Sequence, residues 1–327
     1  MITLGIESTA HTFGVGIIDE NAKILANEKH SLVTEEGGIL PREAADHHVE
    51  HASKVVAQAF KESGLTWNDI DLISCSTSPG LGPCLQVGLT AAKTLALANN
   101  KPLVGVNHCI AHIEIGSALT NAKDPIVLYT SGANTQIIGY EKGRYRVYGE
   151  TLDMGIGNLL DTFGRALGLG FPAGPKIDEM YFKGKKLVEL PYTVKGMDLN
   201  FSGLLTAAEQ KIDKYSKEDM AYSLAHTAFA MLTEVTERAL MHTEKKELLL
   251  GGGVALSKAL RKMLQEMCED QNVSLYIPPA EVCPDNGAMI AWLGYLMYST
   301  GFRQKIGEIE VNQKLRTDQV LANWLKK

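Results

Sequence analysis

The alternation of apolar and polar positions predicts an ordered series of strands and helices. Apolar runs that flank polar turns predict two hairpins, over residues 2–18 and 126–140. Shorter apolar runs predict further strands at 72–76, 103–106, 247–250 and 274–277. Helical periodicity predicts helices at 42–63, 86–99, 219–243, 257–270 and 286–299. Because strands alternate with helices, we expect an α/β fold.

The two hairpins indicate that the chain contains two related halves. Each has small hydroxyl residues at its turn, Ser8 and Thr9 in the first and Thr130 and Ser131 in the second. A polar, turn-rich segment at 120–125 separates the halves. We therefore expect an N-terminal α/β lobe over residues 1–120 and a C-terminal α/β lobe over 121–327, with a nucleotide and metal cleft between them.

Composition and charge exclude several classes of protein. Of 327 residues, 45% are hydrophobic and 21% charged, which is typical of a globular chain and excludes disorder. The net charge of −6 opposes any general attraction to phosphate backbones or anionic membranes, so a nucleic acid must be bound locally or with helper subunits. The five cysteines are scattered and form no C-x-x-C pair, which is typical of a reducing cytosol. The sequence also shows no signal peptide and no apolar span long enough to cross a bilayer. We therefore expect a cytoplasmic protein without membrane attachment.

Two histidines form the strongest candidate for a metal site. His108 and His112 are four residues apart after a predicted strand, which places both imidazoles on one helix face. An ordinary polar helix face accounts equally well for this spacing. Asp285, at the start of an apolar helix, and Tyr129, at the end of a strand, are candidates for further ligands. Cys109 stands where a zinc protease has its catalytic glutamate, so metal-dependent proteolysis is disfavoured.

A second group of histidines lies within the helix predicted at 42–63. His47, His48 and His51 have acidic neighbours, and no predicted strand places them at a cleft. We therefore interpret them as part of a solvated helix face.

Small residues suggest where a phosphate could bind. The hydroxyl-rich turns allow backbone N–H groups to approach anions closely, and a triple glycine at 251–253 lies between a strand and a helix. A glycine series at 155–174 includes Gly174 and is flanked by Asp161 and Asp178, which could accept hydrogen bonds from ribose hydroxyls or could simply be surface carboxylates. Cys84 begins a predicted helix without an evident base nearby, so we expect no covalent catalysis.

Seven segments together resemble a known family. They read LGIESTAHT at 4–12, PREAA at 41–45, PGLGP at 79–83, NHCIAHIEIG at 107–116, SGANTQ at 131–136, GLGFP at 168–172 and DNGAM at 285–289. In this order, and on to 316–318, they resemble the universal tRNA threonylcarbamoyladenosine synthase family. The closer resemblance is to its archaeal and eukaryotic branch, the catalytic subunit of the KEOPS complex. The resemblance implies the two-lobed α/β fold of actin, sugar kinases and heat-shock ATPases, with a central cleft.

The resemblance also implies a reaction and a set of site residues. The family transfers threonylcarbamoyl from threonylcarbamoyl-AMP to the adenine that follows the anticodon in ANN-decoding tRNAs. By resemblance, one iron or zinc ion is held by His108, His112 and Asp285, with Tyr129 beside it. The residues implied for the adenine nucleotide are Tyr129, Thr130, Ser131, Gly132, Ala133, Asp161, Gly174, Asp178 and Ser257, although the family usually has asparagine where this chain has Ser257.

Partners and alternatives complete the expectations. The resemblance implies tRNA as substrate and three partner subunits: a small dimerising protein, a kinase-like ATPase and an accessory subunit. We expect the apolar part of the helix at 42–63 to bind one partner. Some archaeal relatives continue into a fused kinase domain. The alternatives are a small-molecule kinase or carbamoyltransferase of the same fold, and a non-catalytic ATP-binding scaffold with a structural metal.

Overall fold

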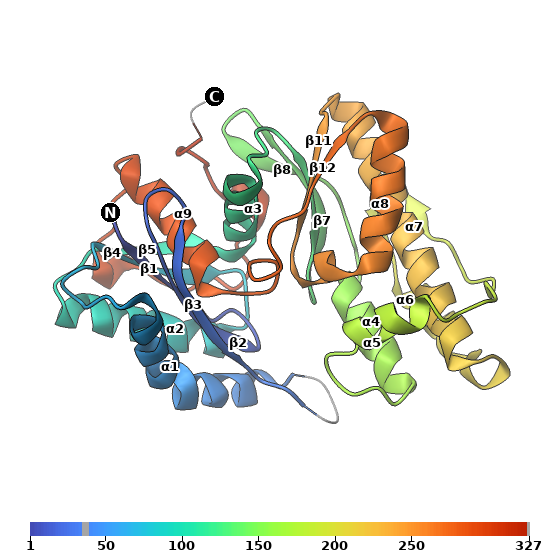
Figure 1. Cartoon of the computed structure of the whole chain (residues 1–327), viewed down its shortest axis with the longest axis horizontal. Coiled ribbons are helices and arrows are strands. Elements are labelled where there is room, and N and C mark those ends of the chain that lie inside the picture. The colour runs from blue at the N-terminus through green and yellow to red at the C-terminus, as the bar shows by residue number, and fades with distance from the viewer. Residues whose placement is uncertain (35–38, 326–327) are drawn as a thin grey trace.

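The computed structural model describes residues 1–34 and 39–325. Two lobes, each built on a five-stranded sheet with covering helices, lie side by side (Figure 1). The two lobes confirm the predicted α/β class and its two-lobed form.

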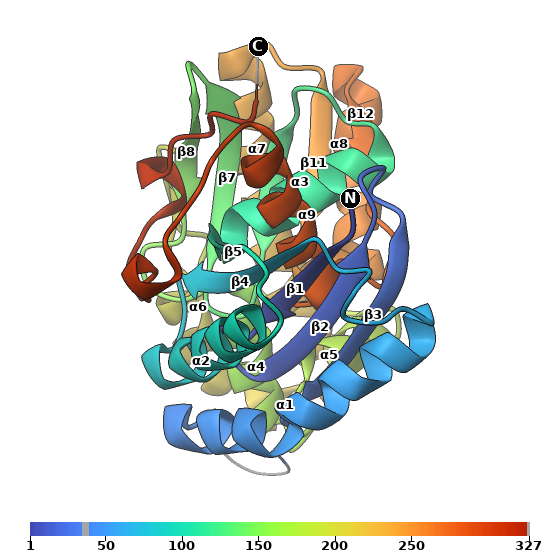
Figure 2. The same ribbon diagram turned by 90° about the vertical axis from the view of Figure 1, so that its left-hand side faces the viewer.

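The N-terminal sheet combines antiparallel and parallel pairing. Its strands are β1 (Thr3–Glu7), β2 (Thr12–Ile18), β3 (Ile24–Ser31), β4 (Leu72–Ser78) and β5 (Leu103–Asn107). Their order is β3-β2-β1-β4-β5, with β1, β2 and β3 antiparallel and β1, β4 and β5 parallel. Helices α1 (Pro41–Ser63) and α2 (Gly82–Ala98) lie next to this sheet (Figure 2).

The C-terminal sheet repeats the same topology. Its strands are β6 (Ile126–Thr130), β7 (Thr135–Glu141), β8 (Arg144–Glu150), β11 (Glu247–Gly251) and β12 (Ser274–Tyr276). The order β12-β11-β6-β7-β8 has the same antiparallel and parallel pairs at equivalent places. The repeated order confirms that the chain consists of two related halves.

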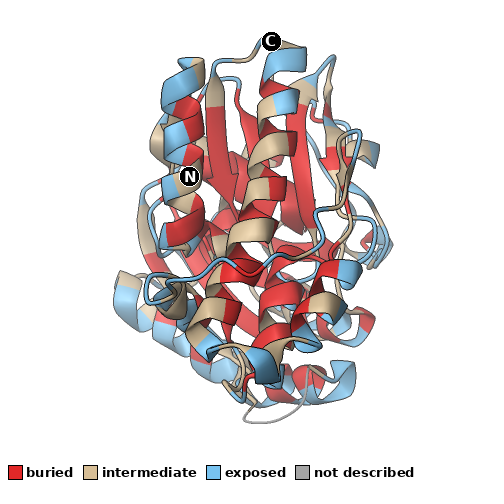
Figure 3. Ribbon diagram, turned by 90° about the vertical axis from the view of Figure 1, so that its right-hand side faces the viewer, coloured by how far each residue is buried: buried red, intermediate tan, exposed pale blue. Residues whose placement is uncertain are grey.

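Helices of the second lobe bury one face and expose the other. They are α4 (Ile156–Ala166), α5 (Gly174–Tyr181), α6 (Ser202–Glu209), α7 (Lys217–Thr243) and α8 (Lys258–Gln271), and the two-stranded ribbon of β9 (Val194–Lys195) and β10 (Asp198–Leu199) lies in the same lobe. Figure 3 shows buried strands behind helices that carry buried, intermediate and exposed residues. The larger core cluster, which includes Phe163, Phe201 and Phe229, fills the space between these elements.

Helix α3 (His108–Thr120) lies between the two lobes. It contacts α9 (Gly287–Ser299) and β11, and every residue from 108 to 116 is buried. A helix that is enclosed on all sides holds its side chains in fixed positions. Its two histidines are therefore presented at the junction between the lobes.

Helix α9 returns from the end of the chain to the first sheet. A side chain at Gly5 or Gly16 would collide with the α9 backbone, since a Cβ at Gly16 would be 2.1 Å from the Ala288 nitrogen. These glycines let the helix lie directly on β1 and β2. The chain passes from the first sheet to the second between β5 and β6, close to residue 120. Helix α9, although it belongs to the range 121–327, packs on the first lobe. The division into lobes of residues 1–120 and 121–327 therefore stays a prediction.

Candidate metal and nucleotide site

The two histidines of α3 are fixed by the way that helix begins. Asn107, at the end of β5, caps α3 by accepting a hydrogen bond from the Ile110 N–H at 3.2 Å. His108 follows immediately and His112 lies one turn later, so both rings occupy the same side of the helix, with centroids 4.8 Å apart. Their exposed fractions are 6% and 3%. The spacing noted in the sequence thus brings two imidazoles together inside the protein.

Asp285 reaches these histidines from the start of α9. The neighbouring Asn286 caps α9 by accepting from the Met289 N–H at 3.0 Å, and its amide donates to the carbonyls of Val282 and Pro284. This anchoring places Asp285 Oδ1 3.5 Å from His108 Nε2 and 3.3 Å from His112 Nε2. The structure therefore brings together three of the residues that the sequence indicated as ligands.

The three groups influence one another's charge. Burial alone would raise the pKa of Asp285, but the neighbouring His108 and His112 hold it well below its usual range. Burial lowers the pKa of His108, but the carboxylates of Glu7 and Asp285 outweigh burial and raise it to about 9. For His112, burial prevails and the pKa is lowered. The site thus contains an ionised carboxylate whose charge is stabilised by the two neighbouring histidine rings.

Sequence reasoning did not assign Glu7 to the site. This carboxylate is fully buried at the end of β1, and its Oε2 accepts a hydrogen bond from His108 Nδ1 at 2.9 Å. Its other oxygen accepts from the Thr9 N–H at 2.6 Å and from the Thr9 hydroxyl. Glu7 therefore orients the ring and leaves Nε2 directed at Asp285. The sequence signal that could have pointed to Glu7 is its position as an acidic residue at the end of an otherwise apolar strand.

The donor set fits a transition metal. Two imidazole nitrogens and one carboxylate oxygen, each from a different one of His108, His112 and Asp285, lie within 4.8 Å of one another. Nitrogen with oxygen ligands suits zinc or iron. Tyr129 is 1% exposed, and its ring centroid lies 5.4 Å from that of His112. Burial raises the pKa of the Tyr129 phenol well above its ordinary value. Its place as a ligand stays a prediction.

Replacing Glu7 by glutamine should weaken metal binding while the fold persists. Glutamine matches the shape of the glutamate, but it presents no charge to His108 and can no longer fix the ring as firmly. Outer-shell changes of this kind typically cost 10- to 100-fold in metal affinity, and we expect a loss of about that size. Competition with a chromogenic chelator measures it. Unchanged affinity in a folded Glu7→Gln protein would contradict the orienting role.

Three loops of the second lobe pack backbone against backbone. A Cβ at Gly155 would be 2.4 Å from the Gly132 carbonyl oxygen, and one at Gly252 would be 2.3 Å from the Thr130 oxygen. Gly252 also has a φ of 85°, which side-chain-bearing residues rarely adopt. The Thr130 hydroxyl donates to the Gly251 carbonyl at 3.1 Å, and the Asn158 N–H donates to the Gly132 carbonyl at 2.9 Å. The turn at 130–134 is therefore held beside the two glycine segments that the sequence pointed out.

The two aspartates implied for ribose binding also hold helix starts. Asp161 accepts a hydrogen bond from the Ala173 N–H at 2.7 Å, at the start of α5. Burial raises the pKa of Asp161, while the backbone N–H groups of Ala173 and Gly174 lower it. Asp178 accepts from the Lys258 and Ala259 N–H groups, at 3.0 and 3.1 Å, and from the Ser257 hydroxyl. Both carboxylates are fixed in place by these contacts. Their contact with a nucleotide, like that of Gly174, stays a prediction.

Ser257 has a structural task that the sequence did not indicate. Its hydroxyl oxygen caps α8 by accepting from the Leu260 N–H at 3.2 Å, while its proton is donated to Asp178. Serine is therefore a suitable residue for this helix start. Its contact with the nucleotide remains a prediction.

Cys84 does not resemble a nucleophile. Its thiol is buried beside α1, and burial raises its pKa to about 11, so that it carries its proton near neutral pH. That Cys84 takes no covalent part in the reaction stays a prediction.

Relatives of known name extend over the whole chain. The sequence model of the family described as TsaD, tRNA N6-adenosine threonylcarbamoyltransferase, matches residues 23–292. A tRNA N6-adenosine threonylcarbamoyltransferase from Thermococcus kodakarensis is 55% identical over 99% of this chain and 100% of its own length. A probable bifunctional tRNA threonylcarbamoyladenosine biosynthesis protein from Methanothermobacter thermautotrophicus is 53% identical over 100% of this chain and 61% of its own.

Solved structures with low identity share the fold. Component A of (R)-2-hydroxyglutaryl-CoA dehydratase from Acidaminococcus fermentans has a TM-score of 0.61 at 15% identity, over 91% of this chain and 99% of that one. HypF from T. kodakarensis has a TM-score of 0.64 at 16% identity, over 91% and 48%. Within the described residues, no helix combines the length and apolar character that crossing a membrane requires. Because family match and full-length identity agree, the chain belongs to the tRNA N6-adenosine threonylcarbamoyltransferase family.

Proposed function

We propose that this chain is a tRNA N6-adenosine threonylcarbamoyltransferase. The observation that carries the proposal is 55% identity with relatives of that name over essentially the full length of both chains. The buried group of His108, His112 and Asp285 supports it, since it provides a centre at which acyl transfer could be promoted. The finer statement is that threonylcarbamoyl-AMP is the donor and the adenine after the anticodon of ANN-decoding tRNAs is the acceptor.

The turn at 130–134 and the glycine segments would hold the adenylate. Backbone N–H groups in such turns can approach phosphate oxygens without interference from side chains. Asp161 and Asp178 are already fixed by backbone donors, and each carboxylate oxygen can accept more than one hydrogen bond. We place the ribose hydroxyls at these two aspartates and the phosphate near Thr130 and Ser131.

The chemistry requires mainly positioning. The N6 amine of adenine attacks the carbamoyl carbon, the bond from that carbon to the phosphate oxygen breaks, and AMP leaves with the electron pair. The attacking nitrogen gives up one proton, which passes to the departing phosphate or to solvent. Since a mixed anhydride already has a good leaving group, the enzyme gains most by aligning a weak nucleophile. A bound metal ion would supply Lewis acidity that favours charge on the acyl or phosphate oxygens.

The chain's own residues would hold and shield this centre. His108, His112 and Asp285 would hold the metal, with Glu7 orienting His108. Tyr129 is buried and its pKa is raised, so its hydroxyl carries a proton that it can donate. Because His108, His112 and Tyr129 are buried, bulk water would have little access to the metal-binding side of these residues.

RNA binding would depend on partner subunits. The chain is acidic, with a net charge of −6, whereas RNA binding needs basic groups near the phosphates. An anticodon-loop adenine can be presented unstacked, so loop shape matters more than groove contacts. We therefore assign much of the basic surface to the three partners implied by the family resemblance.

One partner would bind the groove between α1 and α2. The groove measures about 1390 Å³ and is lined largely by apolar residues of these helices, among them Val49, Val56 and Leu95. This agrees with the expectation that the apolar part of the helix at 42–63 meets a partner. We predict that Val49→Asp weakens binding of one subunit about tenfold or more, because a charge would be buried at that interface.

A matched control is available on α2. Leu97 has the same exposed fraction as Val49, 66%, but does not line the groove. Leu97→Asp should leave binding of all three subunits unchanged in pull-down titrations. Equal effects of Val49→Asp and Leu97→Asp on binding would contradict a partner site in the groove between α1 and α2.

A reconstituted transfer reaction tests the proposed function. The purified chain is combined with its partner subunits, an enzyme that generates threonylcarbamoyl-AMP, ATP and unmodified tRNA. Nucleoside mass spectrometry should detect threonylcarbamoyladenosine with an ANN-decoding tRNA and not with one in which the adenine after the anticodon is replaced. A phosphorylated small molecule without modified adenosine would instead identify the kinase alternative.

A further inference from the structure

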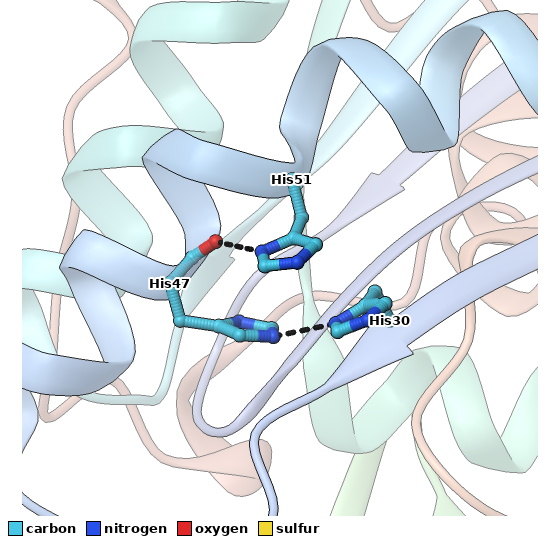
Figure 4. A group of neighbouring side chains, drawn as sticks. All are labelled: His30, His47 and His51. Carbon is cyan, nitrogen blue, oxygen red and sulfur yellow. Dashed lines mark hydrogen bonds between the residues drawn. The ribbon is translucent and has the colours of Figure 1, made fainter.

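A second group of histidines lies between β3 and α1. The interpretation of His47, His48 and His51 as a solvated helix face is wrong, because His47 is only 9% exposed and His48 is fully buried. They lie against the sheet because α1 packs on β2 and β3. His30, near the end of β3, completes the group from the facing strand (Figure 4).

The three rings of His30, His47 and His51 are in mutual contact. The centroids of His30 and His51 are 3.8 Å apart and those of His47 and His51 are 4.4 Å apart, with nearly parallel planes in both pairs. His30 Nδ1 and His47 Nε2 are joined by a 2.7 Å hydrogen bond. One nitrogen from each of the three rings lies within 4.8 Å of the others.

One neighbouring hydrogen bond fixes a tautomer in this group. His51 Nδ1 donates to the His47 carbonyl at 2.9 Å, which leaves a lone pair on Nε2. His47 Nδ1 lies 3.3 Å from His48 Nδ1, and in the tautomer in which it donates to His48 the lone pair of His47 is on Nε2, 2.7 Å from His30 Nδ1. In metal-binding histidines the nitrogen opposite the metal is usually occupied in this way. His51 therefore has a lone pair available on Nε2, and His47 has one on the same nitrogen when it donates to His48.

The surroundings of the group lower the pKa of two of its rings, His30 and His47. Burial, followed by repulsion from His51 and His30, lowers the pKa of His47 to about 4. Burial and the proximity of His51 and Lys54 also lower the pKa of His30, while the nearby Glu50 raises it. The Glu50 carboxylate lies 4.0 Å from His51 Nε2. Neutral imidazoles that resist protonation are the form in which histidine binds metal ions.

We propose that His30, His47 and His51 form a second metal site, selective for a borderline divalent cation such as Zn²⁺. Three nitrogen donors match such ions better than Mg²⁺ or Ca²⁺, which prefer oxygen. His30 is exposed, so an ion can reach the group from solvent. The ion would join β3 to α1, and the site is separate from the one at His108, His112 and Asp285.

Metal binding would require only local movement. Nitrogens bound to a tetrahedral zinc ion are roughly 3.3 Å apart, as follows from Zn–N distances of about 2.0–2.1 Å. The proton shared between His30 Nδ1 and His47 Nε2 would be lost from this contact, with His30 taking the tautomer protonated on Nε2, which frees both facing nitrogens. Rotation of the stacked rings would then direct the three lone pairs at one point.

Zinc titration of full-length variants tests the proposal. Zn²⁺ is titrated against a chromogenic chelator, first into a His108→Ala/His112→Ala protein that lacks the first centre. This protein should bind one equivalent, and the wild type two. Adding His30→Ala, or separately His51→Gln, should abolish the remaining equivalent. His242→Ala, which removes an exposed histidine of α7, should leave it unchanged.

A second readout separates loss of binding from loss of fold. Zinc should raise the unfolding temperature of the His108→Ala/His112→Ala protein, and this rise should disappear with His30→Ala although the metal-free unfolding temperature is retained. The second site is refuted if the His108→Ala/His112→Ala protein binds no zinc. It is also refuted if this protein still binds one zinc ion after the addition of His30→Ala and, separately, of His51→Gln. Neither readout depends on tRNA or on transfer activity.

Discussion

Replacing His112 by alanine is expected to abolish threonylcarbamoyl transfer while leaving the fold intact. His112 is buried and its Nε2 lies 3.3 Å from Asp285 Oδ1, so the substitution removes one of three donors from the proposed centre. Residues that merely orient a ligand cost up to about 100-fold, and loss of a ligand should exceed that. Modified adenosine, measured by nucleoside mass spectrometry, and bound metal should fall together.

The control for this variant is a histidine outside the site. His226 of α7 is half-buried and hydrogen-bonded to the Tyr181 hydroxyl at 3.1 Å. His226→Ala should retain both transfer and bound metal. If His112→Ala turned over like the wild type, a catalytic role of the centre would be refuted, and a structural metal in a scaffold would be favoured.

Replacing Gly252 by alanine should destabilise the packing between the glycine segment at 251–253 and the turn at 130–134. The new Cβ would lie 2.3 Å from the Thr130 carbonyl oxygen, and the residue would have to keep a φ of 85°. Backbone on both sides must then separate, and we expect the free energy of unfolding to fall by about 2–4 kcal/mol. Binding of AMP should weaken with it, because Thr130 begins the turn proposed to hold the phosphate.

The adjacent glycine provides the stability control. A Cβ at Gly253 would meet no atom within 4 Å, and its φ lies outside the positive range. Urea denaturation should therefore show a much smaller change for Gly253→Ala than for Gly252→Ala. Similar stability of both variants would show that the contact with Thr130 does not hold the loops together.

Local patterns were sufficient to predict most of the framework. Strands β4, β5, β11 and β12 and the five expected helices occur within a few residues of their predicted positions, because their apolar periodicity reflects burial on one face. The paired hairpins also revealed the two halves, since each turn is local in sequence. The i, i+4 spacing of His108 and His112 was readable for the same reason.

Elements with weak apolar patterns were not predicted. Strand β3 carries Asn27, Glu28, Lys29 and His30 along the edge of its sheet, so it lacks the alternation of a half-buried strand. Without β3, the facing position of His30 and the burial of His47 could not be inferred. Strand β8 and the short helices α5 and α6 escaped prediction as well. Helix α4 was also missed, although Ile156, Leu159, Leu160 and Phe163 form a clear apolar face, because its glycines were interpreted as a loop.

The remaining features of the site depend on contacts between distant segments. Asp285 meets His112 across 173 positions of sequence, and this requires α9 to lie on β1 and β2. The close approach depends on Gly5 and Gly16, whose role is visible only once the packing is known. Glu7 likewise looks like an ordinary turn residue until His108 is placed beside it.

Removal and return of the metal tests the central claim most directly. The chain is stripped with a chelator, its metal content is verified, and threonylcarbamoyl transfer to an ANN-decoding tRNA is measured with the partner subunits present. We predict that transfer disappears on stripping, returns when zinc or iron is added, and does not return in Asp285→Asn. Undiminished transfer by verified metal-free protein would contradict a catalytic centre at His108, His112 and Asp285.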